Sequence, residues 1–184
     1  MKKRKKLIIL DRDGVINYKS ENYIKNSDEW IPIPGSLEAI ACLNTADYQV
    51  VVATNQSGVG RGYYSLGTLE MIHKKMQREL VKVGGYINHI YFCPHIPEMK
   101  CLCRKPQPGL LHSIANDFPE AFPSAIFVGD SLRDIQAGQA VDCQVALVKT
   151  GNGEETIAAG KGLEGISIYE DLQDFVNYLI LKSK

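Results

Sequence analysis

The sequence has 184 residues, of which 45% are hydrophobic and 23% are charged. This composition excludes an intrinsically disordered chain, and the length predicts a single folded domain over residues 1–184. Twenty-one basic residues balance 21 acidic residues, so the net charge indicates neither a nucleic-acid-binding protein nor one held at an anionic membrane. We therefore expect a small-molecule partner. We also expect a monomer.

A basic run at residues 1–6 precedes the apolar residues 7–10. Such an arrangement can open a signal peptide, but this apolar run is too short for a secretory signal and for a membrane span. The expected location is the cytoplasm.

Short apolar runs alternate with helical patterns along the chain. Each run is rich in β-branched residues, as in buried strands, and the helical segments show apolar residues every three or four positions. The predicted strands are residues 7–10, 50–53, 87–93, 125–128 and 145–148, and the predicted helices are residues 36–46, 66–83, 109–117, 132–140 and about 171–181. This alternation predicts an α/β fold with a parallel sheet covered by helices on both faces.

Polar motifs follow the predicted strands, at the edge where open α/β sheets bind their ligands. Asp11 and Asp13 follow the first strand, two residues apart, so both side chains can point into one crevice. Two close carboxylates suit a hard cation such as Mg²⁺, or a nucleophile beside a proton carrier. A simple turn is the alternative. A calcium-binding EF-hand loop is excluded, because Asn22 stands where that loop requires a glutamate.

Three further segments carry candidate site residues. Asp130 and Asp134 follow the fourth strand, where capping of the next helix by Asp130 or Ser131 is the simpler interpretation. Thr54 follows the second strand and could hold phosphate oxygens, or could be only a polar strand end. Lys105 could neutralise phosphate charge, although most isolated lysines are solvated.

Together these four elements resemble, in order and spacing, the haloacid dehalogenase superfamily over nearly the whole chain. The resemblance implies a Rossmann-like fold and a phosphatase that works through a phosphoaspartate. It implies that Asp11 is the nucleophile, Asp13 the general acid/base, and Thr54 and Lys105 the phosphate-binding residues. Mg²⁺ would be held by Asp11, Asp130 and the backbone carbonyl of Asp13, with Asp134 supporting the site from behind.

A compact cluster of cysteine and histidine lies at residues 93–103. Cys93, His95, Cys101 and Cys103 are four ligands of the type that zinc prefers, and four protein ligands are typical of a structural site. The alternative is buried apolar cysteines beside a loop histidine. We expect a structural Zn²⁺ that fixes the loop and directs the next residues, Arg104 and Lys105, into the crevice.

The motifs FCPH, CxCRKP, DRDG and VGDS, with TNQSGVGRG at residues 54–62, resemble the D-glycero-D-manno-heptose 1,7-bisphosphate 7-phosphatase family. This resemblance implies removal of the 7-phosphate from a phosphorylated sugar, in the synthesis of nucleotide-activated heptose for bacterial lipopolysaccharide. The histidinol-phosphate phosphatases share the aspartates and the zinc loop, and such an enzyme or another small sugar phosphatase is the alternative. A non-catalytic zinc-binding module is a third possibility, which the neutral charge disfavours.

No segment is long enough for a separate cap domain, so short loops must recognise the sugar. The candidate residues for substrate binding are Asn55, Gln56, Ser57, Arg61 and Arg104. Arg61 or Arg104 could bind a second, distal phosphate through two parallel hydrogen bonds. Trp30 could either line the crevice or cover the core.

Overall fold

Parallel strands form one six-stranded sheet in the computed structural model, which describes residues 6–182. The strands are β1 (Lys6–Leu10), β2 (Tyr48–Asn55), β3 (His89–Cys93), β4 (Ile126–Gly129), β5 (Gln144–Val148) and β6 (Ser167–Tyr169). Their order in the sheet is β3-β2-β1-β4-β5-β6, and every neighbouring pair is parallel. From β1 the chain first adds β2 and β3 on one side of the sheet and then β4, β5 and β6 on the other. Open α/β sheets bind ligands at such a point, between β1 and β4.

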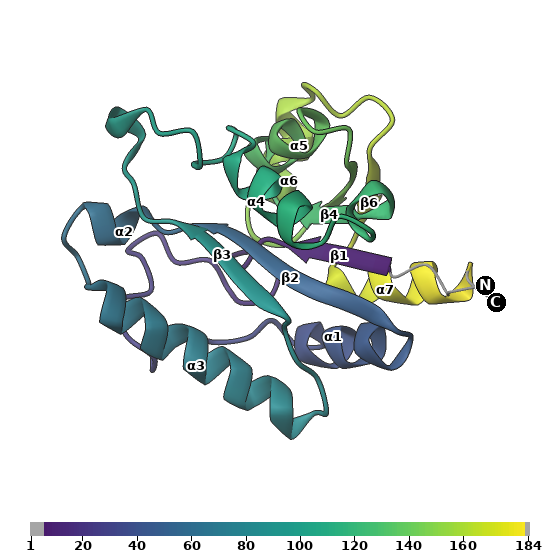
Figure 1. Ribbon diagram of the computed structural model, residues 1–184, viewed down its shortest axis with the longest axis horizontal. Coiled ribbons are helices and arrows are strands. Elements are labelled where there is room, and N and C mark those ends of the chain that lie inside the picture. Colours follow the sequence, from purple (N-terminus) through teal and green to yellow (C-terminus); the bar gives the residue numbers. More distant parts are fainter. Residues whose placement is uncertain (1–5, 183–184) are drawn as a thin grey trace.

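Helices cover both faces of the sheet (Figure 1). On one face lie α1 (Ser36–Thr45), α3 (Leu66–Lys82) and α7 (Leu172–Leu181), and on the other lie α4 (Gly109–Asp117) and α5 (Leu132–Gln139). The remaining short helices are α2 (Ser57–Gly60), α6 (Gly153–Ala159), η1 (Pro97–Met99) and η2 (Phe122–Ser124). The predicted fold class, a parallel sheet between two layers of helices, is confirmed.

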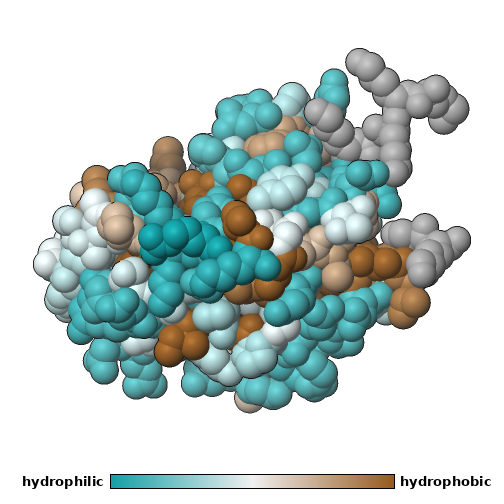
Figure 2. All heavy atoms as spheres, turned by 90° about the horizontal axis from the view of Figure 1, so that it is seen from below, coloured by the Kyte–Doolittle hydropathy of each residue, from teal (hydrophilic) through white to brown (hydrophobic). Residues whose placement is uncertain are grey.

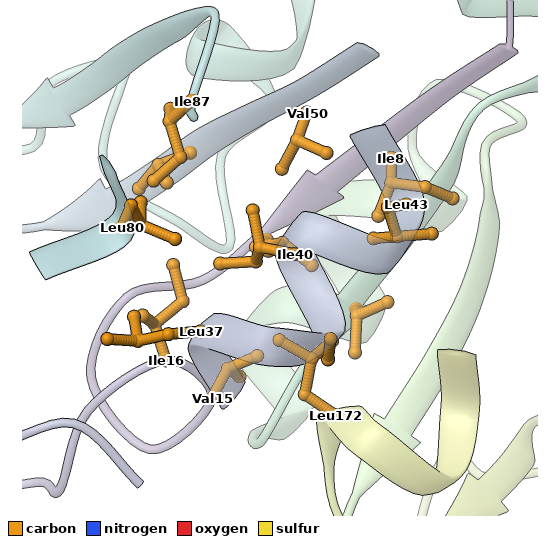
Figure 3. Close-up of a cluster of buried hydrophobic side chains, with 14 of the residues drawn as sticks. Ile8, Val15, Ile16, Leu37, Ile40, Leu43, Val50, Leu80, Ile87 and Leu172 are labelled. Carbon is orange, nitrogen blue, oxygen red and sulfur yellow. The ribbon is translucent and has the colours of Figure 1, made fainter. Parts of the chain in front are cut away.

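β1 lies in the middle of the sheet and contributes to both hydrophobic cores. Ile8 and Leu10 belong to the core shared with α1, α3 and α7, in which Figure 3 shows Ile8 beside Leu43 of α1, whereas Leu7 and Ile9 belong to the core shared with α4 and α5. All four side chains are fully buried. An uninterrupted apolar run is therefore needed here, because alternate side chains face opposite layers of helices.

The long helix α3 has one buried face and one exposed face, which accounts for its amphipathic sequence. Ser65 caps its N-terminus by accepting a hydrogen bond of 3.0 Å from the backbone N–H of Thr68. Leu69, Ile72, Met76 and Leu80 recur at helical spacing and are buried, the last three in the core beneath the sheet. The outer face of this helical layer is largely hydrophilic, with hydrophobic side chains between the polar ones (Figure 2).

The predicted strands and long helices are all present, with ends that differ by one to two residues at most positions. β6 and the short helices α2 and α6 were not predicted. Trp30 is completely buried in the core with α1, which resolves the alternative left open for it. Residues 11–35, all of which are described, contain no helix or strand, in agreement with the expected lack of a cap domain.

The basic residues 1–5 lie outside the described residues. None of the described helices is both long enough and apolar enough to span a membrane.

Candidate active site

A cavity of about 430 Å³ opens at the carboxyl ends of β1, β2 and β4. We call it the active-site cavity. The predicted site residues in its lining are Asp11, Asp13, Thr54, Asn55, Gln56, Ser57, Arg104, Lys105, Asp130 and Asp134. Arg61 is exposed and is not among the lining residues. The structure thus brings together nearly all residues that the sequence nominated.

Lys105 is the central cation of the cavity. Its Nζ lies 2.9 Å from Oδ2 of Asp11 and 2.7 Å from Oδ1 of Asp134, and it donates a 2.7 Å hydrogen bond to the carbonyl of Ala53. Lys105 is almost completely buried. Burial favours the neutral amine, but the charges of Asp11 and Asp134 outweigh it and raise the pKa of Lys105. The surrounding carboxylates therefore favour the charged form of Lys105.

The carboxyl group of Asp11 lies among charged groups that strongly perturb its pKa. Burial, together with the nearby carboxylates of Asp134 and Asp130, raises its pKa to about 8, although Lys105 acts in the opposite direction. Its Oδ1 accepts a 2.7 Å hydrogen bond from the backbone N–H of Arg12. Additional positive charge beside Asp11 would favour the ionised form, as a bound divalent cation would provide.

Asp130 lies close enough to Asp11 to share a metal ion with it. Carboxylate oxygens of Asp11, Asp130 and Asp134 all lie within 4.8 Å of one another. Oδ2 of Asp130 accepts hydrogen bonds of 2.8 Å from both the backbone N–H and the side chain of Asn152. Burial and the charge of Asp134 raise the pKa of Asp130 to about 6. Closely spaced carboxylate oxygens suit Mg²⁺, which prefers oxygen ligands.

Asp134 is a fully buried residue of the site that contacts Lys105 and Ser131. Its Oδ2 accepts hydrogen bonds from the N–H and the hydroxyl of Ser131, which completes a capping box at the start of α5. Burial opposes its ionisation, but the charge and hydrogen bond of Lys105 lower the pKa of Asp134. The capping role that the sequence suggested for Asp130 or Ser131 thus belongs to Ser131, with Asp134 as its partner.

Asp13 is held by a separate set of donors. Oδ1 accepts from Arg12 at 3.0 Å and from Asn17 at 2.9 Å, and Oδ2 accepts from Gln56 at 2.8 Å. Burial acts to raise the pKa of Asp13, but the charge of Arg12 and these hydrogen bonds together lower it. The side chain remains 27% exposed, so Asp13 can be reached from the cavity.

Arg12 is a buried residue of the site that the sequence analysis missed. Its guanidinium bonds to Gln56 at 3.1 Å and approaches Nε2 of His73 at 3.3 Å, in addition to its ion pair with Asp13. Tyr64 donates a 2.9 Å hydrogen bond to the same oxygen of Gln56. A charged residue between two motif aspartates was the available signal, but its partners Gln56, between β2 and α2, and His73, on α3, are distant in sequence.

Several other lining residues were also missed. Lys19 and Glu21 come from the loop after β1, Asn152 precedes α6, and Arg133 lies in the first turn of α5. Asn152 carried no recognisable motif, and Arg133 looked like an ordinary charged residue of a helix.

The cysteine and histidine cluster forms a compact group beside the cavity. The sulfur of Cys103 lies 3.3 Å from that of Cys93, 3.5 Å from that of Cys101 and 3.2 Å from Nδ1 of His95. Tetrahedral zinc with ordinary bond lengths separates its ligand atoms by roughly 3.5–3.8 Å. The donor set and its spacing therefore fit a closed Zn²⁺ site. Arg104 is tied to this loop by a 3.3 Å hydrogen bond to the carbonyl of His95.

Comparison with known proteins places the chain among phosphatases. Residues 102–175 match a family model described as HAD-hydrolase-like. The D-glycero-beta-D-manno-heptose-1,7-bisphosphate 7-phosphatase of Pseudomonas putida is 50% identical, covering 95% of this chain and 99% of the relative. The enzyme of the same name from Helicobacter pylori is 34% identical over 82% of this chain and 87% of the relative.

Two solved structures agree with these relatives. The D,D-heptose 1,7-bisphosphate phosphatase of Bordetella bronchiseptica, complexed with magnesium and phosphate, superposes with a TM-score of 0.94 at 48% identity, covering 96% of this chain and 99% of that one. The corresponding phosphatase of Burkholderia thailandensis gives a TM-score of 0.74 at 45% identity, covering 98% and 100%. This chain therefore belongs to the D-glycero-beta-D-manno-heptose-1,7-bisphosphate 7-phosphatase family of haloacid dehalogenase-like hydrolases.

Proposed function

We propose that this protein is a Mg²⁺-dependent phosphatase that removes the 7-phosphate of D-glycero-β-D-manno-heptose 1,7-bisphosphate through a phosphoaspartate on Asp11. The observation that carries the proposal is the contact of Asp11 with Lys105 inside a cavity that also contains Asp13 and Asp130. Relatives that are about half identical over nearly the full length supply the substrate, and their names specify the β anomer.

Asp11 is the proposed nucleophile. Its carboxylate oxygen forms a bond to the phosphorus of the 7-phosphate as the bond between phosphorus and the sugar oxygen breaks. An anionic carboxylate must approach an anionic phosphate, so positive charge is needed at the point of attack. Lys105 supplies one such charge 2.9 Å from Asp11. Mg²⁺ held by Asp11, Asp130 and the carbonyl of Asp13 would supply further charge and would favour ionised Asp11.

Asp13 is the proposed general acid and base. In the first step it gives a proton to the departing sugar oxygen, and in the second it takes one from the water that hydrolyses the phosphoaspartate. Its hydrogen bonds to Arg12, Asn17 and Gln56 favour the ionised form, which is the form required in the second step. An anionic substrate beside Asp13 would raise its pKa and so favour the protonated form required in the first.

The remaining polar residues of the cavity are proposed to hold and orient the substrate. Thr54 and Lys105 bind the transferred phosphate, whereas Asp134 keeps Lys105 in place through their 2.7 Å ion pair. Asn55, Gln56, Ser57 and Arg104 line the same cavity and would contact substrate or support residues that do. Arg61 remains a candidate for a second phosphate from the sequence, but its exposed position outside the cavity lining gives it no support.

A structural Zn²⁺ at Cys93, His95, Cys101 and Cys103 is proposed to fix the loop that carries Arg104 and Lys105. We further propose that residues 1–184 form one domain, and that the protein acts as a cytoplasmic monomer without nucleic-acid or membrane partners. The lack of strong net charge supports the last part of this proposal.

The deciding experiment compares phosphate release from heptose 1,7-bisphosphate, as separate α and β anomers, with release from histidinol phosphate under the same Mg²⁺ conditions. We expect the highest kcat/KM for the β-bisphosphate. Preference for histidinol phosphate would contradict the proposed substrate but not the proposed phosphatase mechanism. No Mg²⁺-dependent release from any phosphomonoester would instead indicate a non-catalytic zinc-binding protein.

A further inference from the structure

A second cavity, of about 540 Å³, adjoins the active-site cavity. We call it the basic cavity, because Lys100, Arg104, Lys105 and Arg133 line it and no acidic residue does. Its lining residues come from the loop between β3 and α4, which carries the cysteine cluster, and from the start of α5. Arg104, Lys105 and Arg133 line both cavities, so these three residues mark the passage from one to the other.

Of the four basic residues that line this cavity, one forms ion pairs with described residues of the protein and three do not. Lys105 is paired with Asp11 and Asp134. For Lys100, Arg104 and Arg133, no ion pair with a carboxylate is found within the part of the chain that the structure describes. Three cations without an ion pair to a described residue, beside one cavity, form a local site for an anion, although the protein as a whole has no net charge.

Arg133 occupies a position that does not favour a cation for helix stability. It is the second residue of α5, and the N-terminal turn of a helix carries partial positive charge that repels a guanidinium. Its neighbour Asp134 is already engaged by Lys105 and Ser131. An anionic group of a ligand would remove this repulsion, and it would accept hydrogen bonds from the guanidinium.

We propose that Arg133, acting with Arg104 from the opposite side of the passage, binds the phosphate of the substrate that is not hydrolysed. This inference rests on the proposed function, since it concerns the second phosphate of the bisphosphate whose first phosphate is attacked by Asp11. Lys105 separates the two phosphates, with the reacting one in the active-site cavity and the other in the basic cavity. Arg133 is thus a specificity-determining residue for bisphosphates.

Two arginines suit this task better than one. Each guanidinium can donate two parallel hydrogen bonds to a phosphate, and donors from two different segments fix its position as well as its charge. The guanidinium of Arg104 is positioned by its own hydrogen bond to the carbonyl of His95, which leaves its other N–H groups for a ligand, and Arg133 is carried on a helix. Binding energy from this remote phosphate can then orient the reacting one.

The test measures kcat/KM of Arg133→Gln for heptose 1,7-bisphosphate and for the corresponding 7-monophosphate. We expect a loss on the order of tenfold to a hundredfold for the bisphosphate, the size of a lost charged hydrogen bond, and a loss of less than about threefold for the monophosphate. Arg78→Gln removes the same charge from the exposed surface of α3 and lines neither cavity, so it is the matched control. Equal losses on both substrates would overturn the assignment.

A double variant tests whether Arg104 and Arg133 bind the same phosphate. The double variant Arg104→Gln/Arg133→Gln should lose less than the product of the two single losses, because both arginines bind the same phosphate. Fully multiplicative losses would show that they act independently and would overturn their shared role. A selective loss in Arg61→Gln but not in Arg133→Gln would place the second phosphate elsewhere.

Binding to a variant that cannot turn over separates this inference from the proposed chemistry. Calorimetry on Asp11→Asn should show weaker binding of the bisphosphate, by about tenfold or more, when Arg133→Gln is added. Binding unchanged by Arg133→Gln would contradict the inference even if the enzyme is the proposed phosphatase. Conversely, if Asp11→Asn retains turnover, the proposed mechanism is wrong. The comparison of bisphosphate binding with and without Arg133→Gln would still show whether Arg133 binds the second phosphate.

Discussion

The side chain of Asn55 forms two hydrogen bonds with the backbone of Lys105. It donates to the carbonyl at 3.0 Å and accepts from the N–H at 3.1 Å. Asn55 is the last residue of β2, so these bonds tie the loop that carries Lys105 to the end of a central strand. Both polar ends of a residue expected to bind substrate are thereby used to position Lys105.

Asn55→Ala should therefore lower kcat more than it raises KM. Without the two bonds the Lys105 amine loses its fixed place beside Asp11, and we expect kcat to fall by about tenfold or more. Steady-state kinetics on the bisphosphate check this, with Asn177→Ala on the exposed surface of α7 as the control. A rise in KM at unchanged kcat would show instead that Asn55 contacts the substrate directly.

Asp11→Asn should abolish turnover without unfolding the protein. The amide has nearly the same volume but cannot serve as the nucleophile, so kcat should fall by roughly 10³-fold or more. The melting temperature should stay equal or rise, because burial and the repulsion from Asp130 and Asp134 already disfavour the Asp11 carboxylate. Asp28→Asn, on an exposed loop, controls for the loss of a carboxylate. Near-normal phosphate release by Asp11→Asn would rule out the phosphoaspartate.

The meeting of Asp11, Thr54 and Asp130 in one cavity could be predicted from sequence, because each follows an apolar strand and parallel strands end at the same edge of the sheet. Arg12 could not be assigned in this way, since its role depends on His73, Gln56 and Tyr64, which only the fold brings together.

The missed strand β6 has a similar explanation. Within the part of the chain that the structure describes, its three residues pair only with β5 at the edge of the sheet, and they are largely exposed. A short edge strand requires no continuous apolar run, so hydrophobic periodicity gives no signal for it.

Gly14→Ala should damage the site where Asp130 approaches the backbone. A Cβ at Gly14 would lie 2.1 Å from Oδ2 of Asp130, and the φ of +84° adds backbone strain. We expect a destabilisation of about 2 kcal/mol or more together with weaker activation by Mg²⁺. Gly62→Ala is the matched control, because Gly62 also has a positive φ, of +73°, but nothing lies within 4 Å of the added carbon. Similar effects of both substitutions on Mg²⁺ activation would show that strain alone matters.

Purified protein should contain one tightly bound zinc, distinct from the exchangeable Mg²⁺ needed for turnover. Cys101→Ser should loosen the zinc and lower thermal stability, because a thiolate ligand is replaced by a weaker hydroxyl. Cys42→Ser, at an exposed cysteine outside the cluster, should retain the metal. Elemental analysis of protein purified without chelators checks both. Zinc-free wild-type protein would contradict the assigned ligands.

His73 should make the protein less stable as the pH falls below neutrality. Burial, assisted by the charge of Arg12, lowers its pKa from 6.5 to about 3, although Asp13 acts in the opposite direction. Between about pH 6.5 and pH 3 the unfolded chain therefore binds a proton at His73 that the folded protein does not. The unfolded state is favoured by this difference, so the contribution of His73 to the free energy of unfolding is greatest above pH 6.5 and decreases toward pH 3.

The measurement is the free energy of unfolding by urea at about pH 7 and about pH 5.5, compared between wild type and His73→Gln. The wild type should lose about 1 kcal/mol more than the variant over this interval, because glutamine takes up no proton in either state. His112→Gln replaces an exposed histidine on α4 and should behave like the wild type. The change in stability between the two pH values is the relevant quantity, since His73→Gln can also alter stability at both by disturbing the contact with Arg12. Equal pH dependence in wild type and His73→Gln would show that His73 can be protonated in the folded protein, and that the guanidinium of Arg12 does not prevent it.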